Sequence, residues 1–265
     1  MNKAPPPPEM PDVTDTGTII GTIKPLAAPL EPAPILAPSE DKPLNNDDGG
    51  GDAMDVDGEA VESVDEEDAL ATVEKLRGDD LSSRVEAARK LVTVAIALGP
   101  QRTRDELLPF LSDGVDDDDE VLEAVASSLG KLVPYVGGRE YAASLLQPLE
   151  LLLAVEETVV RDKAAASAVI VSECTNDSDY AKEFVGMIGR LATKEWFTAR
   201  ISACGLIPVA FSKMNPELRK THLEHFANLC RDDAPMVRRI ASRNLGKLLY
   251  TVVETMGPAA LHEEE

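Results

Sequence analysis

The sequence predicts an all-α fold, and three observations support this prediction. From about Glu66 onward, apolar residues recur every three or four positions, which is the spacing of amphipathic helices. Aromatic residues make up only 4% of the chain and runs of β-branched residues are short, so sheet is disfavoured. A nine-residue pattern also returns five times, and such repetition is typical of helical repeat architectures.

Residues 1–65 differ in composition from the rest and are expected to form a disordered, Pro-rich acidic tail. Eleven of the 19 prolines precede position 44, and residues 1–69 contain 17 acidic and 3 basic side chains. Apolar residues are too sparse here to offset the entropy cost of ordering the segment. The Gly49-Gly50-Gly51 run is neither preceded by a strand nor followed by Gly-Lys-Ser/Thr, so it is interpreted as a spacer and not as a phosphate-binding loop.

The nine-residue frames begin at Ser83, Val121, Val160, Thr198 and Val237, at intervals of 38, 39, 38 and 39 residues. In each frame, positions i, i+4 and i+8 fall on one stripe of a helix, with a small or medium side chain in the middle. An apolar stretch and a polar turn precede each frame, so the unit is two antiparallel helices, as in HEAT repeats. We expect about five stacked helix pairs over residues 66–252 and an acidic tail at 253–265. An ordinary helical bundle is the alternative.

Four strings within the repeats resemble the scaffold (A, 65 kDa) regulatory subunit of protein phosphatase 2A. They are residues 101–111 (QRTRDELLPFL), 155–164 (VEETVVRDKA), 196–206 (WFTARISACGL) and 232–239 (DDAPMVRR). The resemblance covers roughly residues 66–250 and the family's first five repeats, and the Pro-rich tail has no counterpart in it. It implies a non-catalytic scaffold whose N-terminal repeats hold a regulatory (B-type) subunit. The family's C-terminal repeats hold the catalytic subunit, so that subunit is expected to bind only if further repeats exist.

The turns between the paired helices should line up along one edge of the stack, where solenoids commonly bind partners. Trp196, the only tryptophan, lies in a polar turn and is the expected anchor. For its neighbour Phe197, packing as core between repeats 3 and 4 is favoured over a place at the interface. With the resemblance, the expected partner-binding residues are Asp117, Glu120, Glu156, Glu157, Trp196, Phe197, Asp233, Pro235, Met236 and Arg239.

The arginines divide into two groups. Arg84, Arg161 and Arg238 share the second place of their frames, so each is expected to pair with an acid in an adjacent turn. Arg239 lies one position further and is expected to bind a carboxylate of a partner through bidentate hydrogen bonds.

No cofactor, metal site or catalytic residue is predicted. The acidic run from Asp116 to Glu120 lacks the glycine and glutamate spacing of a calcium loop and is interpreted as a capping turn. His222 and His225 lack a further nearby metal ligand. A di-iron hydroxylase built on HEAT repeats would need several His-Glu pairs, and the sequence has only the pair at His262.

The charge balance limits the choice of partners. With 48 acidic and 26 basic residues, the chain is not expected to bind nucleic acid or a membrane surface. Three widely spaced cysteines and no apolar run of about 18 residues predict a cytoplasmic protein, with the nucleus as a further location. The alternative function is another HEAT-repeat adaptor, for example a transport adaptor that binds basic peptides, although one tryptophan is few for that class.

The last predicted helix keeps its apolar pattern to its end. Solenoids usually end in a repeat with a polar outer face. We therefore expect an uncapped apolar face formed by Leu245, Leu248, Leu249, Val252 and Val253.

Overall fold

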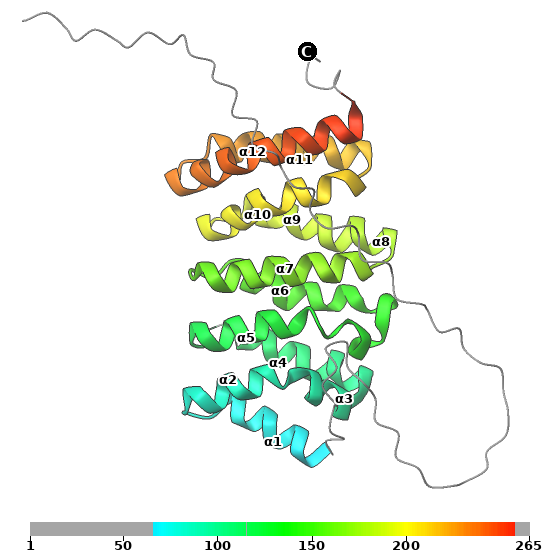
Figure 1. Ribbon diagram of the computed structural model, residues 1–265, viewed down its shortest axis with the longest axis vertical. Coiled ribbons are helices and arrows are strands. Elements are labelled where there is room, and N and C mark those ends of the chain that lie inside the picture. The colour runs from blue at the N-terminus through cyan, green and yellow to red at the C-terminus, as the bar shows by residue number, and fades with distance from the viewer. Residues whose placement is uncertain (1–65, 115, 258–265) are drawn as a thin grey trace, which may run out of the picture. The chain divides into compact units, whose positions relative to one another are not determined.

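The computed structural model describes residues 66–114 and 116–257 of the chain (Figure 1). The predicted tail at residues 1–65 and most of the predicted C-terminal tail lie outside the described residues. In the described part every regular element is helical, which confirms the all-α prediction. No helix in that part is both long and apolar enough to cross a membrane.

The helices form five successive pairs, numbered here as repeats 1 to 5. The first helices are α1 (Glu66–Leu76); α4 (Leu108–Asp113) with the π-helical turn η1 (Thr103–Leu107); α6 (Leu146–Leu152) after the short 3-10 turns η2 (Val133–Val136), η3 (Gly138–Glu140) and η4 (Ala142–Leu145); α9 (Gly186–Thr193) after α8 (Asp177–Asp179) and the π-helical η5 (Tyr180–Val185); and α11 (Pro216–Cys230). The second helices are α2 (Leu81–Arg89) continued by α3 (Leu91–Arg102), α5 (Asp119–Leu129), α7 (Thr158–Cys174), α10 (Phe197–Ala210) continued by η6 (Phe211–Lys213), and α12 (Pro235–Met256).

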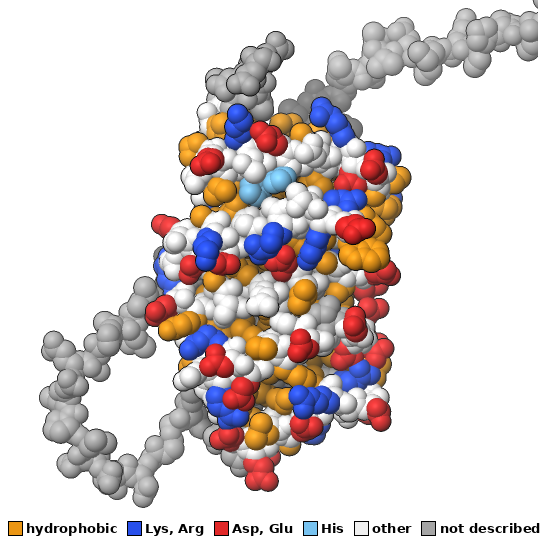
Figure 2. All heavy atoms as spheres, turned by 180° about the vertical axis from the view of Figure 1, so that it is seen from behind, with side chains coloured by type: hydrophobic (Ala, Val, Ile, Leu, Met, Phe, Trp, Pro, Cys, Tyr) orange, Lys and Arg blue, Asp and Glu red, His pale blue; other side chains and the backbone are white. Residues whose placement is uncertain are grey.

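The second helices lie side by side in sequence order. Helix α2 packs on α5, α5 on α7, α7 on α10, and α10 on α12 (Figure 1). The first helices form a second layer, in which α4 packs on α6, α6 on α9, and α9 on α11. Figure 2 shows this second layer, where acidic and basic side chains are interspersed. The two layers in register confirm a stack of five HEAT-type repeats.

The repeated stripe of the second helices is buried within the stack. Each buried valine or leucine side chain of the stripe stabilises the stack by about 1.5–3 kcal/mol. The members of the stripe that are buried are Ala87, Leu91, Val121, Val125, Leu129, Val160, Ala164, Ala168, Thr198, Ser202, Leu206, Val237 and Ala241.

Small residues let α5 and α7 approach closely. The hydroxyl of Ser128 donates to the carbonyl of Ala88 at 2.9 Å, and one repeat later the hydroxyl of Ser167 donates to that of Ala126 at 2.6 Å. A Cβ atom added to Gly130 would lie 2.8 Å from the Ser167 hydroxyl oxygen and 3.1 Å from its Cα. This junction therefore has no room for a methyl group.

The last helix is longer than predicted. The sequence pattern places the end of the solenoid at residue 252, but α12 continues to Met256. Gly257 ends it with a φ of 85°, which only glycine adopts readily, and its N–H donates to the carbonyl of Val253 at 2.9 Å.

The predicted apolar face of α12 is only partly exposed. Leu245 and Leu249 are 40% and 42% exposed, as expected. For Leu248 and Val252 the prediction is wrong, because both are buried in the core of the stack.

Candidate partner-binding ridge

The turns that join the two helices of each repeat lie along one edge of the stack, on the left in Figure 1. We call this edge the ridge and define it as these turns plus the first residues of the second helices. The turns are residues 77–80, 114–118 (with 115 not described), 153–157, 194–196 and 231–234. Because the second helices stack in order, each turn lies beside the next.

Arginines hold three of these turns in shape. Nη1 of Arg161 donates to the carbonyl oxygens five and six residues earlier, at 2.6 and 2.8 Å. Arg200 does the same at 2.5 and 2.8 Å, and Arg238 at 3.0 and 2.6 Å. The predicted pairing with an acid is therefore wrong for Arg161 and Arg238, which form no ion pair with the described residues and satisfy turn carbonyls instead. Burial lowers the pKa of Arg161.

Two arginines connect successive turns. Arg84 forms ion pairs with Asp117 and with Asp118, the latter at 2.6 Å, as predicted for this arginine. Arg200 makes a bidentate pair with Asp232 at 2.6 and 2.9 Å. These hydrogen bonds hold the pKa of Asp232 below its usual value and raise that of Arg200. Arg200 occupies the third place of its frame. The sequence argument compared only the arginines at the second place and therefore did not identify Arg200 as one that connects the repeats.

Two acids predicted to bind a partner are engaged within the chain. Asp117 pairs with Arg84, and its side chain is only 18% exposed. The carboxylate of Glu157 accepts the backbone N–H of Val159 at 3.2 Å and so caps α7. These two carboxylates shape their own turns, as helix N-termini require.

Two aromatic rings lie at the turn of repeat 4. Trp196 precedes α10 and is 65% exposed. Phe197 is 40% exposed, so the expectation that it packs as core is wrong. The next residues, Thr198 and Ala199, are buried and provide the contact between repeats instead.

An exposed row runs along the ridge at the place just before each frame. In repeats 3, 4 and 5 this place holds Val159, Phe197 and Met236, which are 46%, 40% and 50% exposed. In repeats 1 and 2 it holds Ser82 and Glu120, which are also exposed. The sequence argument missed Val159, although the repeat register places it in line with Phe197 and Met236.

The other predicted residues are solvent-accessible. Glu120, Glu156, Asp233, Pro235 and Arg239 are all exposed. None of the charged ones forms an ion pair with another described residue. The ridge therefore carries exposed acids at repeats 2, 3 and 5, apolar side chains at repeats 3 to 5, and a cation at repeat 5.

A hollow of about 590 Å³ lies between the turns of repeats 4 and 5. Its walls are polar and charged, so this part of the ridge can accept hydrogen-bonding groups. It is lined by Thr193, Lys194, Glu195, Arg200, Asn228, Arg231, Asp232 and Asp233.

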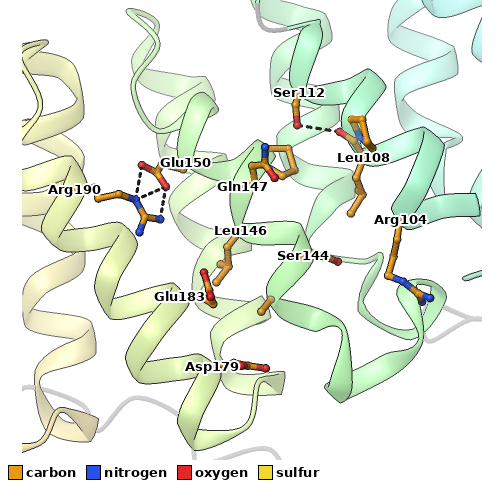
Figure 3. Close-up of a pocket in the computed structure, with 13 residues that line it drawn as sticks. Arg104, Leu108, Ser112, Ser144, Leu146, Gln147, Glu150, Asp179, Glu183 and Arg190 are labelled. Atoms are coloured by element: carbon orange, nitrogen blue, oxygen red, sulfur yellow. Dashed lines mark hydrogen bonds and ion pairs between the residues drawn. The ribbon is translucent and has the colours of Figure 1, made fainter. Parts of the chain in front are cut away.

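A second hollow, of about 540 Å³, lies among the first helices of repeats 2 to 4 (Figure 3). Within it, Arg190 donates to both carboxylate oxygens of Glu150 at 2.6 to 3.1 Å. Arg104 lies over the ring of Tyr141, 3.9 Å from its centroid, and donates to the carbonyl of Val136 at 2.5 Å. Because the chain itself satisfies these arginines, the ridge is the better candidate site.

The histidine pair on α11 packs as part of the structure. His222 is 3% exposed, with Nδ1 2.9 Å from the carbonyl oxygen of Leu218 and Nε2 3.2 Å from that of Val185. Across residues 66–114 and 116–257, no group of three or more His, Cys, Asp or Glu side chains is arranged to hold a metal ion.

The paired helices and aligned turns define a HEAT-repeat α-solenoid. A solved chain from a structural study of tubulin recruitment by microtubule polymerases with TOG domain arrays has the same fold. It matches with a TM-score of 0.52 over 73% of this chain and 43% of that chain, at 16% sequence identity. No family model matches the sequence.

By sequence, the repeat region is homologous to the 65 kDa regulatory proteins of protein phosphatase 2A, which confirms the resemblance. It is 48% identical over 183 residues to the A-type phosphatase 2A regulatory protein of Schizosaccharomyces pombe and to the 65 kDa A alpha isoform of Arabidopsis thaliana. It is 46% identical over 175 residues to the A beta isoform of Rattus norvegicus. These matches cover 66–69% of this chain and 29–31% of the relatives, so the chain spans about a third of their length.

Proposed function

We propose that the chain is a non-catalytic scaffold of a phosphatase 2A-type holoenzyme and that its ridge binds a regulatory (B-type) subunit. The observation that carries this proposal is the 65% exposed indole of Trp196 at the repeat 4 turn of the ridge. Tryptophan is among the residues most enriched at the energetic centres of protein interfaces, because it buries a large area while keeping one hydrogen-bond donor.

The surroundings of Trp196 indicate the chemistry of the partner. The apolar row of Val159, Phe197 and Met236 would contact an apolar patch. Glu156, on one side of this row, suits a basic group, and Arg239, on the other side, suits a carboxylate. The partner surface is thus expected to present a basic group opposite Glu156, an apolar patch, and an acidic group opposite Arg239.

The proposed mechanism is positional. A rigid solenoid that holds a regulatory subunit brings a captured substrate close to any catalytic subunit in the same assembly, at an effective concentration on the order of a millimolar. In this scheme the catalytic subunit performs the bond-breaking step, and the chain contributes geometry.

The test is a binding measurement with a purified B-type subunit. Trp196→Ala is expected to weaken binding by about 30-fold or more, as for a hot-spot residue, while the melting temperature stays within about 1 °C of the parent. Leu70→Ala is a matched control, because Leu70 is 44% exposed on α1, away from the ridge. The proposal fails if Trp196→Ala binds as tightly as the parent.

A second binding measurement, with basic peptides in place of the B-type subunit, addresses the adaptor alternative. If basic peptides bind the chain, and Glu120→Gln and Glu156→Gln weaken that binding while Trp196→Ala does not, then the ridge is an acidic peptide site. That outcome would replace the phosphatase scaffold with a transport-type adaptor.

A further inference from the structure

His222 is a buried titratable side chain in the contact between repeats 4 and 5. It lies in the middle of α11 and is 3% exposed. Its Nδ1 atom lies 2.9 Å from the carbonyl oxygen of Leu218, one turn earlier on the same helix. Its Nε2 atom lies 3.2 Å from the carbonyl oxygen of Val185, the last residue of η5 in repeat 4. The ring therefore connects two successive repeats.

Both ring nitrogens of His222 face hydrogen-bond acceptors. A carbonyl oxygen has no proton to donate, so each contact requires an N–H group on the imidazole. The neutral ring has one N–H group and leaves its other nitrogen unpaired in a buried site. The imidazolium has two and satisfies both carbonyls, through hydrogen bonds that the charge strengthens. Burial by itself favours the neutral ring, but an unpaired buried nitrogen costs free energy as well, so the two contacts favour the protonated ring.

The titratable group that lies against His222 is His225, one turn further along α11. The two ring centroids are 5.4 Å apart. Burial lowers the pKa of His225 and the nearness of His222 lowers it further, whereas Glu224 acts in the opposite direction. Two imidazoles this close repel each other when both are charged, so protonation of one disfavours protonation of the other.

The other charged side chains on the elements that pack against α11 are paired or exposed. The ion pairs are Lys182 with Glu183 on η5, Arg190 of α9 with Glu150, and Arg200 of α10 with Asp232. On α11 itself, Arg219 donates to the carbonyls of Phe211 and Ser212. The charged side chains of α12 and the remaining ones of α11 are exposed, whereas His222 is buried. The charge of His222 therefore depends mainly on the two carbonyls and on His225.

Both imidazoles lie against one residue of α9. A Cβ atom added to Gly189 would lie 3.7 Å from Nε2 of His222 and 3.9 Å from Nε2 of His225. The two rings therefore fill the contact between α9 and α11 at this point. A change in the hydrogen bonds of His222 acts directly on the packing of these two helices.

We propose that His222 is a pH-sensitive latch between repeats 4 and 5. As the imidazolium, it donates to both Leu218 and Val185 and joins α11 to the end of η5. As the neutral ring, it gives up one of the two hydrogen bonds, and the contact between the repeats weakens. Because the folded junction binds this proton better than the unfolded chain does, the stabilisation is complete at acidic pH and is lost as the pH rises.

The place of the latch connects it to the ridge. Helix α9 leads into the turn that carries Trp196, and α11 leads into the turn before Met236. A weaker contact between α9 and α11 would let these two turns move relative to each other. The latch itself does not depend on what the ridge binds, and its test needs no partner.

The first test reads the protons on the ring directly. In the full chain with ¹⁵N-labelled histidine, NMR at about pH 7 should find protons on both nitrogens of His222, whereas an ordinary histidine is mostly neutral at that pH. His222→Gln should raise the pKa of His225 by about half a unit or more, because it removes the neighbouring positive charge. The measurement on the parent chain needs no variant, so it decides the question even if His222→Gln does not fold.

The second test is the pH dependence of stability, measured by urea unfolding of the parent and of His222→Gln. The ratio of their unfolding constants should be about tenfold larger at about pH 6 than at about pH 9, because the variant lacks the proton that stabilises the parent. His225→Gln is the matched control on the same helix. Its ratio should change by less than about threefold and in the opposite direction, because the lowered pKa of His225 makes the parent less stable at acidic pH.

Three results would each overturn the proposal. The first is a single N–H on His222 at about pH 7. The second is an unchanged pKa of His225 in His222→Gln. The third is a ratio of unfolding constants for His222→Gln that stays the same across this pH range. In each case His222 would be a neutral core residue that contributes by its packing alone.

Discussion

Repeats 2 and 5 have the same plan, but their equivalent residues have different surroundings. Eight places into the frame, Leu129 of repeat 2 is fully buried, whereas Leu245 of repeat 5 is 40% exposed. One place further, a Cβ atom on Gly130 would collide with Ser167, whereas one on Gly246 would meet nothing. Helix α7 covers this side of α5, and no described helix covers the same side of α12. Val237 and Ala241 of the same repeat are fully buried, so it is the last member of the stripe that depends on the following repeat for its burial.

The largest expected effect tests this difference directly. Leu129→Ala should lower the free energy of unfolding by about 3 kcal/mol, because it leaves a cavity between α5 and α7. Leu245→Ala should cost less than about 1 kcal/mol, because the side chain is already half in water. Urea unfolding followed by circular dichroism measures both values. If both variants lose the same free energy of unfolding, the two positions do not differ in the way that their burial indicates.

A second test concerns the charges that join repeats 4 and 5. Arg200→Met removes the partner of Asp232, whose side chain is 9% exposed, and leaves two turn carbonyls without a donor. With allowance for partial solvent screening, the expected loss is about 2 kcal/mol. Arg190→Met breaks an exposed pair with Glu150 and should cost less than about 1 kcal/mol. The melting temperatures of both variants distinguish the two ion pairs. An unchanged melting temperature in Arg200→Met would show that the turns do not depend on Arg200.

The sequence predicted the stacked repeats well, because the same local pattern recurs in every repeat. A frame such as the one at Val160 shows the stripe through its own spacing, without reference to other repeats. The exposed anchor of the ridge was also predictable in part, because Trp196 is large, apolar and located in a polar turn. The position of Phe197 was not, since the core contact falls one residue later, at Thr198.

The uses of charged residues were harder to predict. Asp117 and Glu157 looked free in the sequence, but one pairs with Arg84 from the preceding repeat and the other caps its own helix. Arg84 and Asp117 are 33 positions apart. Repeat register identifies equivalent positions, but it does not specify which atom of a neighbouring turn a long side chain reaches.

A third prediction uses the equivalent glycines and expects opposite signs. Gly130→Ala should destabilise the chain by about 1–2 kcal/mol, because its methyl group would press on Ser167 at the junction of α5 and α7. Gly246→Ala should stabilise it by about 0.5–1 kcal/mol, because alanine favours helix and the position is open. Destabilisation by both substitutions would mean that the position of Gly246 is not open, which would contradict the contrast between the two repeats.

The smallest expected effect is a pH dependence at the junction of repeats 4 and 5. The hydrogen bonds from Arg200 hold the pKa of Asp232 below its usual value of about 3.9. The stabilisation from the ionised carboxylate is therefore complete above about pH 4 and is lost as the pH falls through the lowered pKa. Asp232→Asn should cost about 1 kcal/mol or less at pH 7, and its deficit against the parent should shrink towards pH 3.

The matched control for this measurement is Asp233→Asn, because the exposed carboxylate of Asp233 forms no ion pair with a described residue. It should change the free energy of unfolding little at either pH. A deficit for Asp232→Asn that stays constant between pH 7 and pH 3 would mean that the cost comes from replacing the oxygen that accepts from Arg200 with an amide NH2 group, and not from the loss of charge. The charge of the Arg200 pair would then not be what joins these two repeats. The larger loss expected for Arg200→Met than for Arg190→Met would have to come from the two turn carbonyls alone.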